Sequence, residues 1–120
     1  MKILIAEDEA ITLATMQIRL KKDGHEVFTA NNGQEALALA KEHTFHLVIT
    51  DIMMPFVSGL EVLSFVKKQE KPAPVIVLSA MGQENVVVEA FTLGADDYIT
   101  KPFSPNELAL RVRRFALQVH

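Results

Sequence analysis

Charged and hydroxyl side chains follow four of the five short apolar segments in this 120-residue sequence. In chain order, the residues that follow these segments are Glu7, Asp8, Asp51, Ser79 and Lys101. If the segments are parallel strands, their carboxyl ends meet at one edge of a sheet, where open α/β sheets bind ligands. We therefore expect these five side chains to converge.

Three carboxylates and one lysine at the same place indicate a particular chemistry. Neighbouring carboxylates raise one another's pKa unless a cation neutralises them. Hard oxygen ligands suit Mg²⁺, which bridges carboxylate and phosphoryl oxygens. Lys101 adds a second positive charge, and the Ser79 hydroxyl can donate to a phosphoryl oxygen. The set predicts Mg²⁺-dependent phosphoryl transfer, which needs mainly positioning and charge neutralisation.

Each of these residues also has an ordinary structural interpretation. Glu7 and Asp8 fit the acidic start of a helix, where the helix dipole favours negative charge. Asp51 fits a turn or a helix cap, Ser79 a loop hydroxyl and Lys101 a solvated charge. Their joint placement at the ends of four strands favours the site over this set of separate explanations.

The five apolar segments predict strands buried in a parallel sheet, because they are apolar on both faces. Their ranges are Ile3–Ala6, Val27–Ala30, Leu47–Thr50, Val75–Leu78 and Tyr98–Thr100. Helical patterns fill the gaps, from about Glu9 to Lys22, after the caps Asn32, Ser58 and Ser104, and from Glu84 to Leu93. Right-handed crossovers then give a doubly wound (βα)5 three-layer α/β sandwich, one domain over residues 1–120.

Two of the helices carry specific expectations. In the first, Ile11, Ala14 and Ile18 form an apolar stripe that should face the core, with Leu13 and Leu20 as its further candidates. In the fourth, the adjacent β-branched residues Val86–Val88 disfavour a helix. We still predict a helix there, because two parallel strands need a crossover between them.

The composition excludes several classes of protein. Hydrophobic residues make up 49% of the chain, which predicts a packed core. A net charge of −3 gives the domain no basic surplus for nucleic acid, and the lack of cysteine excludes disulfides and thiolate metal sites. No apolar run approaches the roughly 18 residues of a membrane span. The start of the chain has no signal-peptide pattern, so the expected compartment is the cytoplasm.

Four segments carry a resemblance to a known family: ILIAEDE (3–9), VITDIMMPFVSGLEV (48–62), VIVLSA (75–80) and GADDYITKPFSPNEL (94–108). Together they resemble the receiver domain of two-component response regulators over nearly the whole chain. The resemblance implies a flavodoxin-like fold with strand order 2-1-3-4-5. It also implies a histidine kinase or phosphotransfer protein as phosphodonor, and a domain that catalyses only its own phosphorylation and dephosphorylation.

The resemblance assigns roles in phosphorylation and metal binding. Asp51 matches the phosphoacceptor of the family. Asp8, Asp51 and the backbone carbonyl of Met53 match the ligands of Mg²⁺, and Glu7 matches an acid that acts on the metal through water.

The resemblance also assigns a switch. Ser79 matches the switch hydroxyl, Tyr98 the switch aromatic, and Lys101 the lysine that contacts the phosphoryl group. The Lys101–Pro102 peptide matches one that is cis in the family. Proline lowers the free-energy cost of the cis form of the peptide bond that precedes it. The implied response moves Tyr98 inward and repacks the face made by the fourth helix, the fifth strand and the fifth helix.

That face leaves two interpretations open. The segment DDYITKPFSPNELALRV is similar to the winged-helix DNA-binding subfamily, whose receivers dimerise through salt bridges there. Asp97 and Arg111 match the subfamily, whereas Glu89 stands where it usually has a basic residue. A solvated mixed-charge surface is the alternative. We expect the output to lie in an effector domain or a downstream protein, not in nucleic-acid binding by this domain.

Phe56 departs from the family, which often has a small or polar residue after this proline. We expect its ring to pack on its own loop, and a contact with the kinase or a partial lid over the site is the alternative.

Three other functions compete with a phosphorylated receiver. A pseudo-receiver would act by protein contact alone. An aspartyl-nucleophile phosphatase would need a second aspartate two residues after Asp51, where this chain has Met53. A flavin carrier would need a Ser-, Thr- or Gly-rich phosphate loop, where this chain has three successive acids.

Overall fold

Five parallel strands alternate with five helices in a computed structural model that describes residues 1–118. The elements are β1 (Lys2–Ala6), α1 (Ala10–Lys22), β2 (Glu26–Ala30), α2 (Gly33–Glu42), β3 (Leu47–Asp51), α3 (Gly59–Lys67), β4 (Val75–Ser79), α4 (Glu84–Thr92), β5 (Asp97–Thr100) and α5 (Pro105–Ala116). The strand order is β2-β1-β3-β4-β5, and every neighbouring pair is parallel. The predicted fold class and strand order are confirmed.

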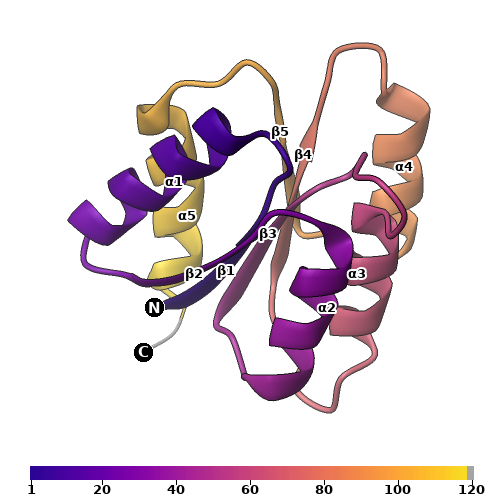
Figure 1. Cartoon of the computed structure of the whole chain (residues 1–120), viewed down its shortest axis with the longest axis horizontal. Coiled ribbons are helices and arrows are strands. Elements are labelled where there is room, and N and C mark those ends of the chain that lie inside the picture. Colours follow the sequence, from indigo (N-terminus) through magenta and orange to yellow (C-terminus); the bar gives the residue numbers. More distant parts are fainter. Residues whose placement is uncertain (119–120) are drawn as a thin grey trace.

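The helices cover the sheet in two layers. Figure 1 shows α1 and α5 on one face, and α2, α3 and α4 on the other. Successive side chains of the central strands enter opposite cores, as the pleat requires. In β1, for example, Ile3 and Ile5 pack toward Leu20 of α1, whereas Leu4 packs toward Val62 of α3. All five residues of β3 and of β4 are buried, which confirms the prediction for these strands.

Side-chain caps set the start of three helices where the sequence predicts them. The oxygens of Asn32, Ser58 and Ser104 accept hydrogen bonds from backbone amides three residues later, at 2.8, 3.4 and 3.1 Å respectively. Each cap satisfies an amide that the first turn of a helix leaves unpaired. Within residues 1–118, no helix is long and apolar enough to cross a bilayer.

The predicted core-facing stripe of α1 is wrong for Ile11, Ala14 and Ile18, whereas the further candidates Leu20 and Leu13 are buried and partly buried in the core. Ile11 and Ile18 are 80% and 69% exposed, and Ala14 is exposed as well. Met16 and Leu20 are the residues that α1 buries, against the sheet and α5. Both stripes have helical spacing, so periodicity alone cannot decide which of them faces the core.

Strand β5 and helix α4 are less buried than predicted. Strand β5 lies at the edge of the sheet and alternates, with Asp97 and Ile99 buried and Tyr98 and Thr100 exposed. Helix α4 forms despite its valines, but Ala90 is its only fully buried residue. The edge position and the shallow packing of α4 leave one face of β5 open.

Gly59 holds the loop between β3 and α3 close to the end of β3. Its amide donates to the carbonyl of Ile52 at 2.8 Å, and a Cβ at this position would lie 1.9 Å from the carbonyl oxygen of Asp51. No side chain fits in that space, so glycine is required by close backbone approach.

We expect Gly59→Ala to lower the free energy of unfolding by about 3 kcal/mol, because the methyl group must push the loop away from β3. Gly24→Ala is the control, since its Cβ meets nothing within 4 Å and the cost is only that of its φ of +95°, about 1 kcal/mol. Urea denaturation of both variants measures the difference. Equal losses would contradict this account of Gly59.

Candidate functional site

The carboxyl edge of the sheet brings together the acids that the sequence singles out. Glu7 and Asp8 follow β1 directly, and Asp51 is the last residue of β3, the neighbouring strand. One carboxylate oxygen from each of these three residues lies within 4.8 Å of the others. The parallel register places the ends of β1 and β3 side by side, and this produces the cluster.

Lys101 enters the same cluster from the end of β5. Its Nζ lies 2.5 Å from Glu7 Oε1 and 2.9 Å from Asp51 Oδ2. Glu7 is fully buried and Asp51 is 6% exposed, so the carboxylate of each ion pair is shielded from water, whereas the Lys101 side chain is partly exposed. The amide of Lys101 also donates to the carbonyl of Ser79 at 2.7 Å, which fixes the lysine to the end of β4.

The electrostatics of the cluster follow from burial and from this lysine. Burial raises the pKa of Glu7 to about 7, the Lys101 ammonium opposes this rise, and the negative charge of Asp51 adds to it. Burial lowers the pKa of Lys101, but its pairing with Glu7 and Asp51 outweighs burial, so the pKa is raised. One ammonium thus stands against three carboxyl groups, and the pocket favours a further cation.

The donor set fits a hard divalent cation. Glu7 Oε1 is buried and lacks a hydrogen-bond partner among residues 1–118, since its short contact with Lys101 does not have hydrogen-bond geometry. Asp8 is exposed, which gives the cluster a solvent-facing side. Carboxylate oxygens with room for water are the ligands that Mg²⁺ prefers. Met53, whose carbonyl is predicted to join them, lies two residues past Asp51.

Ser79 and Tyr98 border a groove beside the cluster. Ser79 ends β4 and is 2% exposed, whereas Tyr98 on β5 is 42% exposed. The Tyr98 ring packs edge-to-face against Phe91 of α4, with centroids 5.8 Å apart. A groove of about 520 Å³ lies between these elements and is lined by Ser79, Val87, Phe91 and Tyr98 among others. Tyr98 therefore points outward and has space inward of it.

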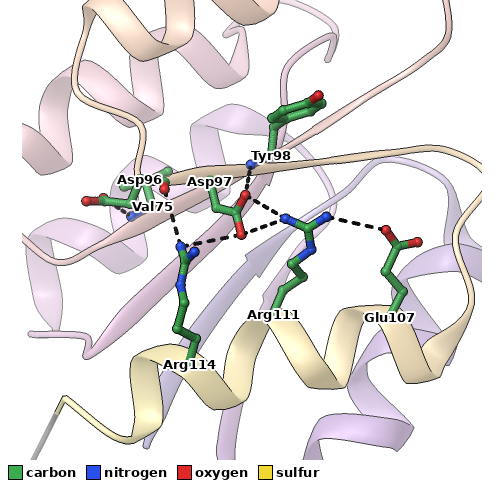
Figure 2. Close-up of polar contacts among 7 residues, drawn as sticks. All are labelled: Val75, Asp96, Asp97, Tyr98, Glu107, Arg111 and Arg114. Carbon is green, nitrogen blue, oxygen red and sulfur yellow. Dashed lines mark hydrogen bonds and ion pairs between the residues drawn. The ribbon is translucent and has the colours of Figure 1, made fainter.

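The face formed by α4, β5 and α5 carries an ion-pair network centred on Asp97 (Figure 2). Asp97 is 7% exposed, and its carboxylate accepts hydrogen bonds from Arg111 Nη1 at 3.0 and 3.2 Å. Arg114 lies 3.5 Å from the same carboxylate, and the amide of Tyr98 donates to it at 2.8 Å. The interpretation of Asp97 as part of a solvated surface is wrong, and its partners belong to its own chain.

Asp96 has a separate structural role that sequence reasoning did not assign. Its carboxylate accepts from the amide of Val75 at 2.8 Å and from Lys67 Nζ at 2.7 Å. It therefore ties the start of β5 to the start of β4 and to the end of α3. Adjacent aspartates before a strand gave no signal that distinguishes this role from that of Asp97.

The expectation that Phe56 packs on its own loop is wrong. The residue is 95% exposed, and its φ of +67° lies in the left-handed region. A positive φ raises the free energy of a bulky residue by about 1–2 kcal/mol relative to its ordinary conformations.

The prediction for the Lys101–Pro102 peptide is confirmed, because this peptide bond is cis.

Comparison with known sequences gives a consistent result. Residues 3–113 match the response regulator receiver domain family. The transcriptional regulatory protein SrrA of Staphylococcus aureus is 41% identical over 112 residues, which are 93% of this chain and 46% of SrrA. The chain thus spans about half the length of the curated relatives it matches.

Comparison with solved structures identifies receiver domains as well. The receiver domain of the Francisella response regulator 1452 superposes with a TM-score of 0.89 at 33% identity, covering 99% of this chain and 98% of that one. The chemotaxis response regulator CheY4 of Vibrio cholerae has a TM-score of 0.88 at 31% identity, covering 95% and 97%. This chain therefore belongs to the response regulator receiver domain family of two-component systems.

Proposed function

We propose that this receiver accepts a phosphoryl group on Asp51 from a histidine kinase or a histidine phosphotransfer protein. The observation that carries the proposal is the position of Asp51, which pairs with Lys101 and lies within 4.8 Å of two other carboxylates at the end of a central strand. Such an arrangement neutralises charge around one carboxylate and orients it, which is what phosphoryl transfer needs.

The transfer exchanges one bond to phosphorus for another. A carboxylate oxygen of Asp51 forms a bond to the phosphorus as the phosphorus–nitrogen bond of a donor phosphohistidine breaks. The donor nitrogen keeps the electron pair of that bond, and Lys101 holds the phosphoryl oxygens by charge. Water later attacks the phosphorus, which regenerates the Asp51 carboxylate and releases inorganic phosphate. The domain thus acts on itself and on no external substrate.

We further propose Mg²⁺ as the cofactor, held by Asp8, Asp51 and the Met53 carbonyl, with Glu7 acting through water. The buried Glu7 Oε1, which pairs with Lys101 but accepts no hydrogen bond among residues 1–118, and the excess of carboxylates over ammonium groups support this assignment. When bound, the ion neutralises negative charge on the carboxylates and on the transferred phosphoryl group.

The switch that we propose uses Ser79 and Tyr98. The Ser79 hydroxyl donates to the phosphoryl group on Asp51, and Tyr98 turns from its exposed position into the groove next to Ser79. This movement breaks the contact of Tyr98 with Phe91 and repacks α4, β5 and α5. A difference of a few kcal/mol between the two states is sufficient to reverse their populations.

The same face is where we place the output. Val88 and Phe91 are exposed apolar side chains on α4, and they support a contact with a second copy of this chain. The relative SrrA is a transcriptional regulatory protein of about twice this length, so we propose an effector domain or a downstream protein as the responder. We place the domain in the cytoplasm with its kinase.

Two other functions are less well supported. A pseudo-receiver would not need the lysine, the three acids and the buried serine together. An aspartyl-nucleophile phosphatase would need an acid two residues after Asp51, where Met53 stands.

Phosphorylation by acetyl phosphate tests the proposed function. We expect intact-mass spectrometry to show one added phosphoryl group on the wild type with Mg²⁺, none with a chelator, and none on Asp51→Asn. Asp23→Asn is the matched control, because this aspartate pairs with Arg19 on the surface of α1 and should leave the reaction unchanged. Phosphorylation of Asp51→Asn would overturn the assignment.

Glu7 gives the metal site a pH dependence. Its folded pKa of about 7 lies above the ordinary 4.5, so the metal-free protein should lose stability as the pH rises between these values. Mg²⁺ needs the deprotonated carboxylate, so its stabilisation should be larger at about pH 8 than at about pH 6.

Thermal unfolding with and without Mg²⁺ measures both effects. Glu7→Gln should flatten the pH dependence of the metal-free protein, whereas Glu26→Gln, on the exposed start of β2, should not. A Mg²⁺ effect that is equal at the two pH values would argue against the role of Glu7.

Arg111→Met tests whether Asp97 is paired within one chain. We expect a loss of about 2 kcal/mol in unfolding free energy, because a buried carboxylate loses its main partner while Arg114 remains. Arg113→Met, an exposed arginine on the same helix, should change stability by less than about 0.5 kcal/mol. A loss that depends on protein concentration would instead place the Arg111 pair across a dimer.

A further inference from the structure

Phe56 is presented to solvent by a loop in which several neighbouring residues are packed. Its side chain is 95% exposed, whereas Ile52 and Met54 are buried and Val57 is partly buried in the core between the sheet and α2–α4. The loop is therefore an ordered part of the fold from which one ring projects. Packing within the chain does not explain this ring.

The backbone conformation at position 56 is unusual for phenylalanine. Among residues 1–118, Phe56 is the only residue other than glycine with a positive φ, at +67°. Glycine and asparagine adopt this conformation readily, whereas a bulky aromatic does not. The loop therefore carries an unfavourable backbone conformation at a residue whose side chain gains nothing from burial.

The position of Phe56 points to contact with another molecule at the phosphorylation site. The loop begins at Asp51 and is closed at its other end by Gly59, whose amide bonds to Ile52 at 2.8 Å. Two more exposed apolar side chains, Met53 and Met81, stand on the loops that follow β3 and β4. An exposed aromatic on a fixed loop is the kind of residue that dominates protein interfaces.

We propose that Phe56 is a specificity-determining residue that docks into an apolar pocket on the phosphohistidine-bearing donor protein. This rests on the proposed function. Asp51 is only 6% exposed, so a protein donor must cover the rim of the site to bring its phosphorus to the carboxylate. A small phosphodonor reaches the same carboxylate without covering the rim. A comparison of the two kinds of donor therefore distinguishes an effect on protein docking from an effect on phosphoryl transfer itself.

The experiment compares Phe56→Asn with the wild type in two reactions. Asparagine accepts a left-handed φ, so the variant should fold with unchanged or higher thermal stability; Phe56→Gly is the second variant, because glycine fits this φ at least as well. Phe56→Tyr keeps the ring. Leu117→Ala removes an equally apolar, 69% exposed side chain at the far end of α5. The donors are phosphoramidate and the autophosphorylated histidine kinase cores of the source organism.

We expect Phe56→Asn and Phe56→Gly to lower kcat/KM with the kinase core that serves the wild type best by about tenfold, mainly through KM. Their rates with phosphoramidate should stay within about twofold of the wild type. Phe56→Tyr should restore the kinase reaction, and Leu117→Ala should alter neither.

Each other outcome overturns a defined part of the proposal. A wild-type kinase reaction in Phe56→Asn and Phe56→Gly would exclude docking through this ring. An equal loss with both donors would make Phe56 part of the site itself, and so a lid and not a docking residue. If no kinase core phosphorylates a wild-type protein that reacts with phosphoramidate, histidine kinases are excluded as the docking partner. Failure of phosphoramidate on the wild type would instead overturn the proposed function.

Discussion

The pairing of one ammonium group with two buried carboxylates is the interaction on which the site depends. Lys101 Nζ contacts Glu7 and Asp51, which come from different strands, and it reaches them from β5 across β4. The amide of Lys101 is bonded to the carbonyl of Ser79, so the sheet itself holds the lysine over its middle. A buried carboxylate without such a partner would be strongly destabilising. The strand order therefore determines which charges meet, because it places the residues at the ends of β1, β3 and β5 along one edge of the sheet.

Strand β5 links this cluster to the surface that we assign to output. Its four residues carry Asp97 at one end, held by Arg111, and lead directly into Lys101 at the other. Tyr98 lies between them and faces the groove next to α4. The proposed phosphorylation of Asp51 would change the charge that Lys101 faces, and any movement of Lys101 would act on a short edge strand. The coupling between site and surface therefore needs few intermediate contacts.

The residues that sequence reasoning placed well are those whose position follows from local chemistry. Strand ends, capped helix starts and the converging acids all follow from apolar runs and turn residues, as Ser104 and Asp51 illustrate. The errors concern questions that only packing answers. Ile11 lies on one of two equally spaced apolar stripes, and Phe56 is apolar but has no neighbour to cover it. The partners of Asp97 are 14 and 17 residues away, beyond any local pattern.

Burial differs across the sheet in a way that suits a switch. The central strands β3 and β4 are buried throughout, and they hold Asp51 and Ser79. Helix α4 buries only Ala90 fully, and the edge strand β5 is buried on one face alone. Elements with few buried contacts are the ones that can rearrange at low free-energy cost. The proposed acceptor thus lies on the most firmly packed strands, and the proposed movement is confined to the elements whose repacking disturbs the core least.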